Sequence, residues 1–195
     1  MTAIAERPTS ETIVAFIADI FKRRGADSYL GEDVTMSQHM LQCAQLAERA
    51  GADDDVVAAA LLHDIGHYTS EFGAEAHLDE VDNLHEEAGG RLLDEYFPKI
   101  VTDCVRHHVA AKRYLCATND KYFSRLSSAS VLSLKLQGGP MSDEEVAEFS
   151  KEENLKAILR VRVWDDEGKD PEMTTPEFDH YAPLLERVVQ RHATA

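Results

Sequence analysis

A histidine–aspartate doublet, His63-Asp64, directly follows the apolar run 56–62 and constrains the fold of this chain more than any other feature. A carboxylate and an imidazole in an apolar interior cost free energy unless both find partners. A metal ion satisfies both, because imidazole nitrogen and carboxylate oxygen suit iron, manganese or zinc. His67 follows His63 by one helical turn and is expected on the same face. The alternative is a hydrogen-bonded core histidine beside a capping or surface aspartate, which the doublet alone does not exclude.

Length and charge limit the possible partners. With 195 residues, of which 44% are hydrophobic, the chain fits one domain, residues 1–195, with a sizeable core. Its net charge of −16 argues against nucleic acid or an anionic membrane as the main partner, and no apolar run approaches the ~20 residues of a membrane span. A small anionic substrate remains compatible, since a metal and a few Lys or Arg side chains reverse the sign locally. The sequence makes no prediction of oligomeric state.

The cysteines and the first residues predict a cytoplasmic protein. Cys43, Cys104 and Cys116 are odd in number and lack a CxxC spacing, which indicates free thiols in a reducing compartment. Residues 1–9 contain no long apolar segment of the kind found in signal peptides. Residues 1–8 are expected to form a flexible N-terminus.

The hydrophobic pattern predicts an all-α, single-domain helical bundle. Apolar residues recur at helical spacing, and we find no strand alternation and no internal repeat. Thr35-x-x-Gln38 and Ser142-x-x-Glu145 read as capping boxes, and Thr9 and Ser10 are expected to cap the first helix. The expected helices cover 11–24, 36–50, a segment from 54 that carries the doublet, 85–96, a segment from 98, 123–136, 143–149, 155–167 and 178–192.

Further ligand-type side chains fall on the core-facing stripes of other helices. They are His39, His85, Asp165 and one member of the pair His107-His108, between which periodicity does not choose. Each histidine alone is more often structural, and Arg162, one turn before Asp165, offers that carboxylate an ordinary ion-pair partner. We do not expect unrelated structural residues to place ligand-type side chains on the apolar faces of five helices by chance. Four nitrogens and two carboxylates exceed the needs of one metal with an open position, and suit two metals bridged by one carboxylate, most simply Asp64.

Longer segments resemble a known family. The order H…HD…H…H…D is similar to that of the binuclear HD-domain superfamily, and several segments are similar to the mixed-valent diiron oxygenases that cleave phosphonates. These segments are 29–32 (Tyr29-Leu30-Gly31-Glu32), 41–44, 59–68, 108–115, 126–130, 137–141 and 162–166. Together they extend over nearly the whole chain. The resemblance also selects His108 over His107, because His108 directly precedes the Val-Ala-Ala-Lys run.

The resemblance implies two iron ions, as an Fe(II)/Fe(III) pair, with O2 as co-substrate. It implies that His39, His63 and Asp165 hold one iron, that His85 and His108 hold the other, and that Asp64 bridges them. It assigns the phosphonate to Lys112, with Ser130, Gln137 and Arg162 as further groups of the anion pocket. His67 would lie beside the substrate as a hydrogen-bonding or acid–base group. Tyr29 would fill an open iron position until substrate arrives, and Glu32 would face the positively charged nitrogen of the substrate.

The family acts on 1-hydroxy-2-aminoethylphosphonate or its N-trimethylated analogue, releasing phosphate with glycine or glycine betaine. A quaternary nitrogen offers no donor and prefers aromatic faces and diffuse negative charge. Residues of both kinds occur near the expected site, namely Tyr29, Tyr68, Phe72, Glu32, Asp79, Glu80 and Asp82. We therefore predict oxidative C–P cleavage of (R)-1-hydroxy-2-(trimethylamino)ethylphosphonate to glycine betaine, with the primary amine, which gives glycine, as the alternative.

Two further alternatives use the same ligands differently. An HD phosphohydrolase would hold Zn, Mn or Mg and attack with a metal-bound hydroxide. A non-catalytic HD-like signalling or scaffold domain would hold no metal. The Tyr29–Glu32 segment and the set Lys112, Gln137 and Arg162 argue against the first, and the complete ligand set argues against the second.

Overall fold

The computed structural model describes residues 8–29, 31–68 and 85–194. These residues form helices without a strand, and their one isolated β-bridge joins Ser28 to Thr35, so the all-α prediction is confirmed. The helices are α1 Ile13–Arg24, α2 Met36–Arg49, α3 Asp54–Leu62, η1 Ile65–Tyr68, α4 His85–Leu93, α5 Lys99–Thr118, η3 Phe123–Arg125, α6 Ser128–Leu136, α7 Asp143–Phe149, α8 Leu155–Glu167 and α9 Phe178–Ala193.

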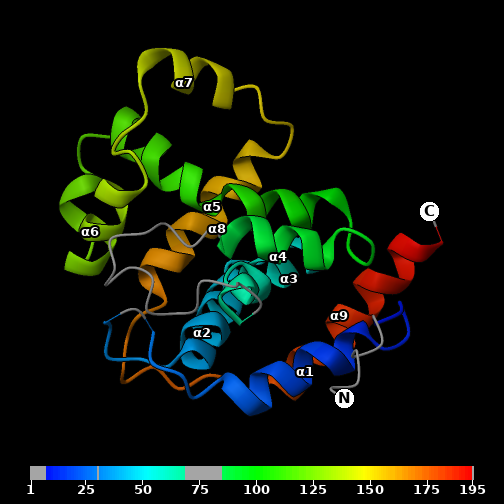
Figure 1. The fold of residues 1–195 in the computed structure, drawn as a ribbon. Coiled ribbons are helices and arrows are strands. Elements are labelled where there is room, and N and C mark those ends of the chain that lie inside the picture. Colours follow the sequence, from blue (N-terminus) through cyan, green and yellow to red (C-terminus); the bar gives the residue numbers. More distant parts are fainter. Residues whose placement is uncertain (1–7, 30, 69–84, 195) are drawn as a thin grey trace, which may run out of the picture.

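Helix α3 forms the centre of the bundle (Figure 1). It packs against α2, α5, α8 and α9. All its residues from Val56 to Leu62 are buried, as expected for a helix that is apolar all round. Helices α5 and α8 also pack closely against each other. Because α3 ends inside the bundle, the polar residues that follow Leu62 emerge in the interior.

Local capping chemistry explains several helix boundaries. Thr35 and Gln38 form the predicted capping box of α2, and Ser142 and Glu145 form that of α7. The predicted cap of the first helix is wrong by two to three residues, because α1 begins at Ile13 with Thr12 at the N-cap position.

The predicted helix over the doublet is also corrected. Helix α3 ends at Leu62, His63 occupies its C-cap position, and residues 65–68 turn into the short helix η1. The expected helix over 123–136 divides into η3 and α6, because Leu126 is extended and Ser127 begins a new helix by accepting from the Ser130 amide.

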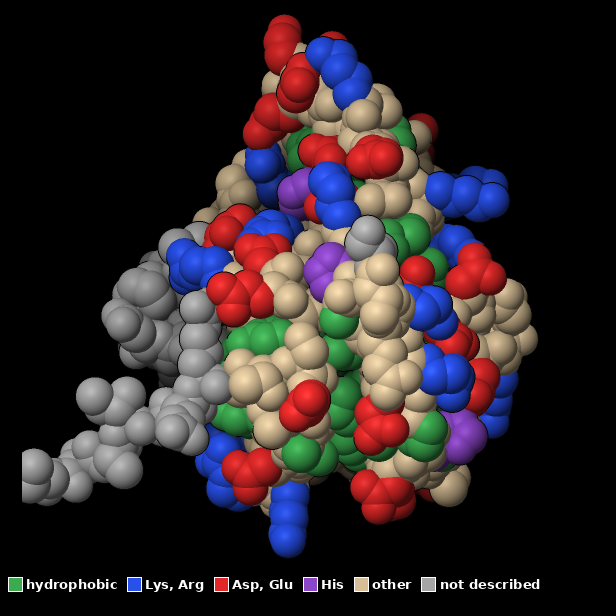
Figure 2. All heavy atoms as spheres, turned by 90° about the vertical axis from the view of Figure 1, so that its right-hand side faces the viewer, with side chains coloured by type: hydrophobic (Ala, Val, Ile, Leu, Met, Phe, Trp, Pro, Cys, Tyr) green, Lys and Arg blue, Asp and Glu red, His purple; other side chains and the backbone are tan. Residues whose placement is uncertain are grey.

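Acidic and basic side chains lie interspersed on the face drawn in Figure 2, with no continuous basic area on that face. Within the described ranges, no helix combines the length and the apolar character needed to cross a bilayer. The N-terminal prediction, apart from Pro8, lies outside the described residues, as do Leu30, Phe72, Asp79, Glu80 and Asp82.

Candidate metal centre

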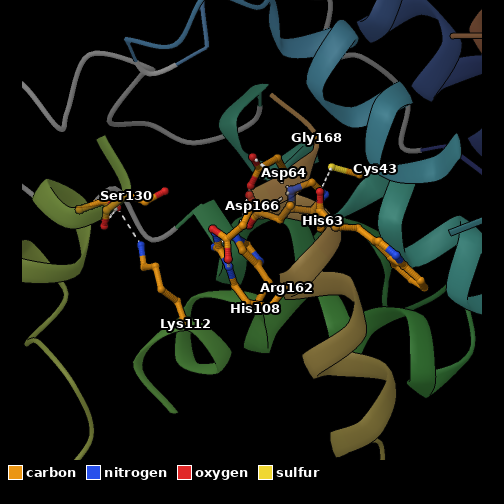
Figure 3. Close-up of polar contacts among 12 residues, drawn as sticks. Cys43, His63, Asp64, His108, Lys112, Ser130, Arg162, Asp166 and Gly168 are labelled. Carbon is orange, nitrogen blue, oxygen red and sulfur yellow. Dashed lines mark hydrogen bonds and ion pairs between the residues drawn. The ribbon is translucent and has the colours of Figure 1, made fainter. Parts of the chain in front are cut away.

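Six predicted ligand side chains from five segments of the chain meet in the interior of the bundle, and Figure 3 shows three of them, His63, Asp64 and His108. They are His39 of α2, His63 and Asp64 after α3, His85 at the start of α4, His108 of α5 and Asp165 of α8. Each is at most 6% exposed. Such burial of imidazoles and carboxylates requires partners, and they find these chiefly in one another.

The two oxygens of Asp64 face two different histidine pairs. Asp64 Oδ2 lies 3.4 Å from both His39 Nε2 and His63 Nε2. Asp64 Oδ1 lies 3.3 Å from both His85 Nε2 and His108 Nε2. The carboxylate therefore stands between two nitrogen pairs, which is the arrangement that a bridging ligand of two metals needs.

Three of the histidines are oriented by main-chain carbonyl groups. The acceptors are Gly168 O for His39 Nδ1, Ala60 O for His63 Nδ1 and Val105 O for His108 Nδ1, at 2.8, 2.9 and 2.7 Å. A carbonyl oxygen only accepts, so each Nδ1 carries the proton and each neutral ring presents its Nε2 lone pair. This is the usual orienting contact of metal-binding histidines.

The Nε2 atoms of each pair point at each other at short range. The distance is 3.1 Å between His39 and His63 and 2.9 Å between His85 and His108. Two lone pairs at such distances repel, and a cation near each pair removes the repulsion. The donor set of nitrogens and carboxylates therefore fits two metal ions of the kind that bind imidazole and carboxylate together.

Asp165 takes part both in the centre and in an ion pair. Its Oδ1 lies 3.6 Å from His39 Nε2, its Oδ2 lies 3.8 Å from His63 Nε2, and Arg162 Nη1 donates to Oδ2 at 2.6 Å. The ion pair with Arg162, raised above as an alternative to metal binding, is thus present. The ion pair leaves Asp165 Oδ1 directed toward the histidines. Asp165 can therefore pair with Arg162 and also bind a metal.

Electrostatics at the centre favour an ionised Asp64 and neutral His39 and His108. Burial raises the pKa of Asp64, but the surrounding histidines, His63 first, outweigh it and hold the pKa well below its usual range. Burial lowers the pKa of His39 and of His108. Burial also lowers the pKa of His63, but Asp64 outweighs it and the net shift is upward. The negative charge that favours a proton on His63 equally favours a metal cation there.

Cys43 lies beside the centre, and its Sγ and ligand atoms of His39 and His63 all lie within 4.8 Å of one another. Its Sγ is 3.9 Å from His39 Nδ1 and donates to Trp164 O at 3.4 Å. Burial raises the pKa of this thiol well above its usual value, whereas a metal ligand must be the thiolate. Burial therefore favours the protonated thiol at Cys43, and Cys43 is outside the predicted ligand set. It is free, as are Cys104 and Cys116.

Two aromatic rings stack on the candidate ligands. His67 lies on η1 rather than on a helix with His63, and its ring stacks on His85 with centroids 3.9 Å apart. His67 Nε2 is 3.8 Å from Asp64 Oδ1, and burial, followed by His85, holds the His67 pKa well below its usual value. Tyr29 stacks on His39, also at 3.9 Å. Both rings therefore border the centre.

A cavity of about 60 Å³ adjoins the centre, enough for several water molecules. It brings together all the residues predicted to contact substrate, which are Tyr29, Glu32, His67, Lys112, Ser130, Gln137 and Arg162. Gln137 Oε1 is buried without a hydrogen-bond partner among the described residues. Lys169 and Ser133 also line the cavity and were not predicted. Lys169 follows Gly168, where α8 ends, so helical periodicity gives no signal for it.

The cavity carries opposite charges on different elements. Lys112 is buried, and its Nζ donates to Ser133 Oγ at 2.7 Å. Burial and then Arg162 lower the Lys112 pKa to about 7. Glu32, on the loop before α2, accepts from Ser127 Oγ at 2.5 Å. Gly31, at φ +84°, forms the turn that separates Tyr29 from Glu32.

The chain is similar to one domain family and to two phosphonate dioxygenases. The family model for the HD domain matches residues 36–159. The chain is 57% identical over 183 residues (94% of this chain, 93% of the relative) to the [1-hydroxy-2-(trimethylamino)ethyl]phosphonate dioxygenase (glycine-betaine-forming) of Leisingera caerulea. It is 40% identical over 164 residues (84% of this chain, 82% of the relative) to the hydroxymethylphosphonate dioxygenase of Gimesia maris.

Proposed function

The chain belongs to the HD-domain family, and we propose that it is a diiron oxygenase that uses O2 to cleave the C–P bond of (R)-1-hydroxy-2-(trimethylamino)ethylphosphonate. The products are glycine betaine and phosphate. In this reaction one O2 supplies two oxygen atoms, the C1–P bond breaks, C1 becomes a carboxylate carbon and one proton is released. The relative from Leisingera caerulea, named for this substrate and product, supports the choice of the trimethylated compound.

The observation that carries the proposal is the position of Asp64 between two histidine pairs. We assign His39, His63 and Asp165 to one metal and His85 and His108 to the other, with Asp64 as the bridge. The facing Nε2 atoms and the carbonyl-bound Nδ1 atoms support this assignment. Two irons, cycling between Fe(II) and Fe(III), would supply the activation of O2 and the oxidation of C1.

The residues of the cavity complement a zwitterionic substrate. Lys112 and Arg162 provide positive charge for the phosphonate, and Ser130 and Gln137 provide neutral hydrogen-bonding groups beside them. Glu32 offers a carboxylate to the quaternary nitrogen, which needs negative charge but no hydrogen-bond acceptor.

The two stacked rings have separate proposed roles. Tyr29, stacked on His39, closes the centre until substrate enters. His67, held neutral by burial, hydrogen-bonds or exchanges a proton with the substrate. The three free cysteines agree with a reducing compartment, and we propose the cytoplasm as the location.

The function is tested by measuring phosphate and glycine betaine from the iron-loaded protein with this substrate, in air and without O2. We expect equal amounts of both products in air and none without O2. Phosphate release without O2 would indicate a phosphohydrolase, and an iron content near zero after reconstitution would indicate a non-catalytic domain. Parallel reactions with 1-hydroxy-2-aminoethylphosphonate and hydroxymethylphosphonate test the substrate, and faster turnover of either would overturn the trimethylated assignment.

The lowered pKa of Lys112 predicts a pH dependence of anion binding. Below about pH 7 the ligand-free protein carries the ammonium, and above it Lys112 is neutral and must take up a proton when a phosphonate dianion binds. We expect methylphosphonate affinity to fall about tenfold per pH unit above pH 7. The Lys112→Arg variant keeps its charge, so its affinity should not fall in this range. The titration of methylphosphonate itself affects the wild type and the Lys112→Arg variant equally. If calorimetry gives the same pH dependence of affinity for both proteins, the prediction is wrong.

Replacement of Tyr29 tests its closing role. We expect Tyr29→Phe to change the optical and electron paramagnetic resonance spectra of the substrate-free iron protein, because the phenol oxygen is lost while the ring stacking on His39 is kept. Tyr114→Phe is the matched control, since Tyr114 packs on Phe149 and its hydroxyl contacts Ser150. Substrate-free spectra of Tyr29→Phe that match those of the wild type would remove the closing role.

A further inference from the structure

Lys169 is a cation of the cavity that has no part in the function proposed above. It directly follows Gly168, at the end of α8, and its side chain is 10% exposed. Its Nζ lies 3.4 Å from Ser130 Oγ, 3.5 Å from Asp165 Oδ1 and 3.8 Å from Asp166 Oδ1. It also lies 6.0 Å from the centroid of the Tyr29 ring. The ammonium therefore sits at the junction of the metal centre and the cavity.

The carboxylates near Lys169 already have closer partners. Arg162 Nη1 donates to Asp165 at 2.6 Å, and Arg162 also pairs with Asp166 through Nε at 3.1 Å and through Nη2. The hydroxyl of Tyr122 donates to Asp166 as well. Lys169 thus stands at the edge of a charge network that is occupied by Arg162. Once Asp165 also ligates a metal, less of its negative charge remains for Lys169. The half-buried ammonium of Lys169 then favours a new anion.

Lys112 approaches the same turn of α6 from a different element. Its Nζ donates to Ser133 Oγ, while Lys169 Nζ contacts Ser130 Oγ. Ser130 and Ser133 are three residues apart and therefore neighbours on one helix face. Figure 3 shows Lys112 extending from α5 toward Ser130. Both ammonium groups thus meet serine hydroxyls on one wall of the cavity that both lysines line.

We propose that Lys169 and Lys112 together clamp the phosphonate group of the substrate. Each ammonium exchanges its serine hydroxyl for a phosphonate oxygen, a charged acceptor that forms a stronger hydrogen bond than a neutral one. The clamp rests on the proposed function, because it takes the phosphonate as ligand. It gives a role to the half-buried lysine that follows the helix carrying Asp165, and it makes Lys169 a substrate-binding residue.

The clamp is tested by calorimetry with methylphosphonate on the iron-loaded protein. We expect Lys169→Met to bind this probe about 10- to 100-fold more weakly, the loss expected for one charge-assisted contact, with the iron content unchanged. Lys169→Arg should retain most of the affinity. Lys151→Met is the matched control, because Lys151 is 69% exposed and pairs with Glu148, and its affinity should equal that of the wild type.

The possible outcomes distinguish a failure of the clamp from a failure of the proposed function. Unchanged affinity in Lys169→Met, with or without a loss of iron, would overturn the clamp and leave Lys169 a positioning residue for Asp165. Absence of binding to the wild type would overturn both the clamp and the proposed function. Weaker binding by the variant, together with no oxidation of any hydroxyphosphonate by the wild type, would retain the clamp and overturn the function. Lys169→Gln repeats the measurement if the methionine variant loses its helical circular dichroism signal.

Discussion

His108→Ala is expected to bind about one iron per chain instead of two and to lose more than about 100-fold in kcat. The side chain provides one of the two nitrogens that lie 3.3 Å from Asp64 Oδ1. Even the loss of groups that merely orient a ligand costs 10- to 100-fold in metal affinity or activity. The metal-free protein should keep its fold, because the substitution removes the close contact between His108 and His85 Nε2 atoms. Metal analysis, circular dichroism and turnover measure these effects.

The neighbouring histidine provides the control. His107 lies on α5 beside His108, but it is 28% exposed and faces Glu152 and Phe149. We expect His107→Ala to bind two irons with turnover near that of the wild type, and to lose at most about 1 kcal/mol of unfolding free energy, as for other partly exposed contacts. Full turnover in His108→Ala, or the loss of one iron in His107→Ala, would overturn the ligand assignment.

The sequence is sufficient to predict those parts of the structure that depend on contacts between residues close in the chain. The capping boxes at Thr35 and Ser142 begin α2 and α7 as predicted, because the residues that satisfy the first amide groups are close in sequence. The buried character of α3 follows from its continuous apolar run. The same reasoning brings His39, His85 and Asp165 to core-facing positions, since helical periodicity alone determines the face of a side chain.

Where tertiary contacts decide the structure, the sequence is not sufficient. The end of α3 before His63 depends on how η1 packs against α4, and no pattern in residues 54–68 signals it. The division of the centre into two histidine pairs depends on the two faces of Asp64, and spacing alone does not determine it. Lys169 escapes prediction because it lies after a helix end, where side-chain direction follows the loop and not a helical period.

Gly66→Ala is expected to destabilise the protein by more than about 3 kcal/mol, the range of severe overpacking, and to remove the second iron. A Cβ atom at Gly66 would lie 1.7 Å from His85 O and 2.7 Å from Gly89 N. These are backbone atoms, so α4 itself must shift and carry the His85 imidazole away from Asp64. Gly90→Ala, on α4, is the matched control, because the three atoms nearest to its Cβ all belong to the side chain of Arg106. There, the loss of an exposed ion pair is offset by the higher helix propensity of alanine. We therefore expect Gly90→Ala to retain two irons and nearly the wild-type unfolding temperature, whereas a Gly66→Ala protein with both properties would contradict the close packing of η1 on α4.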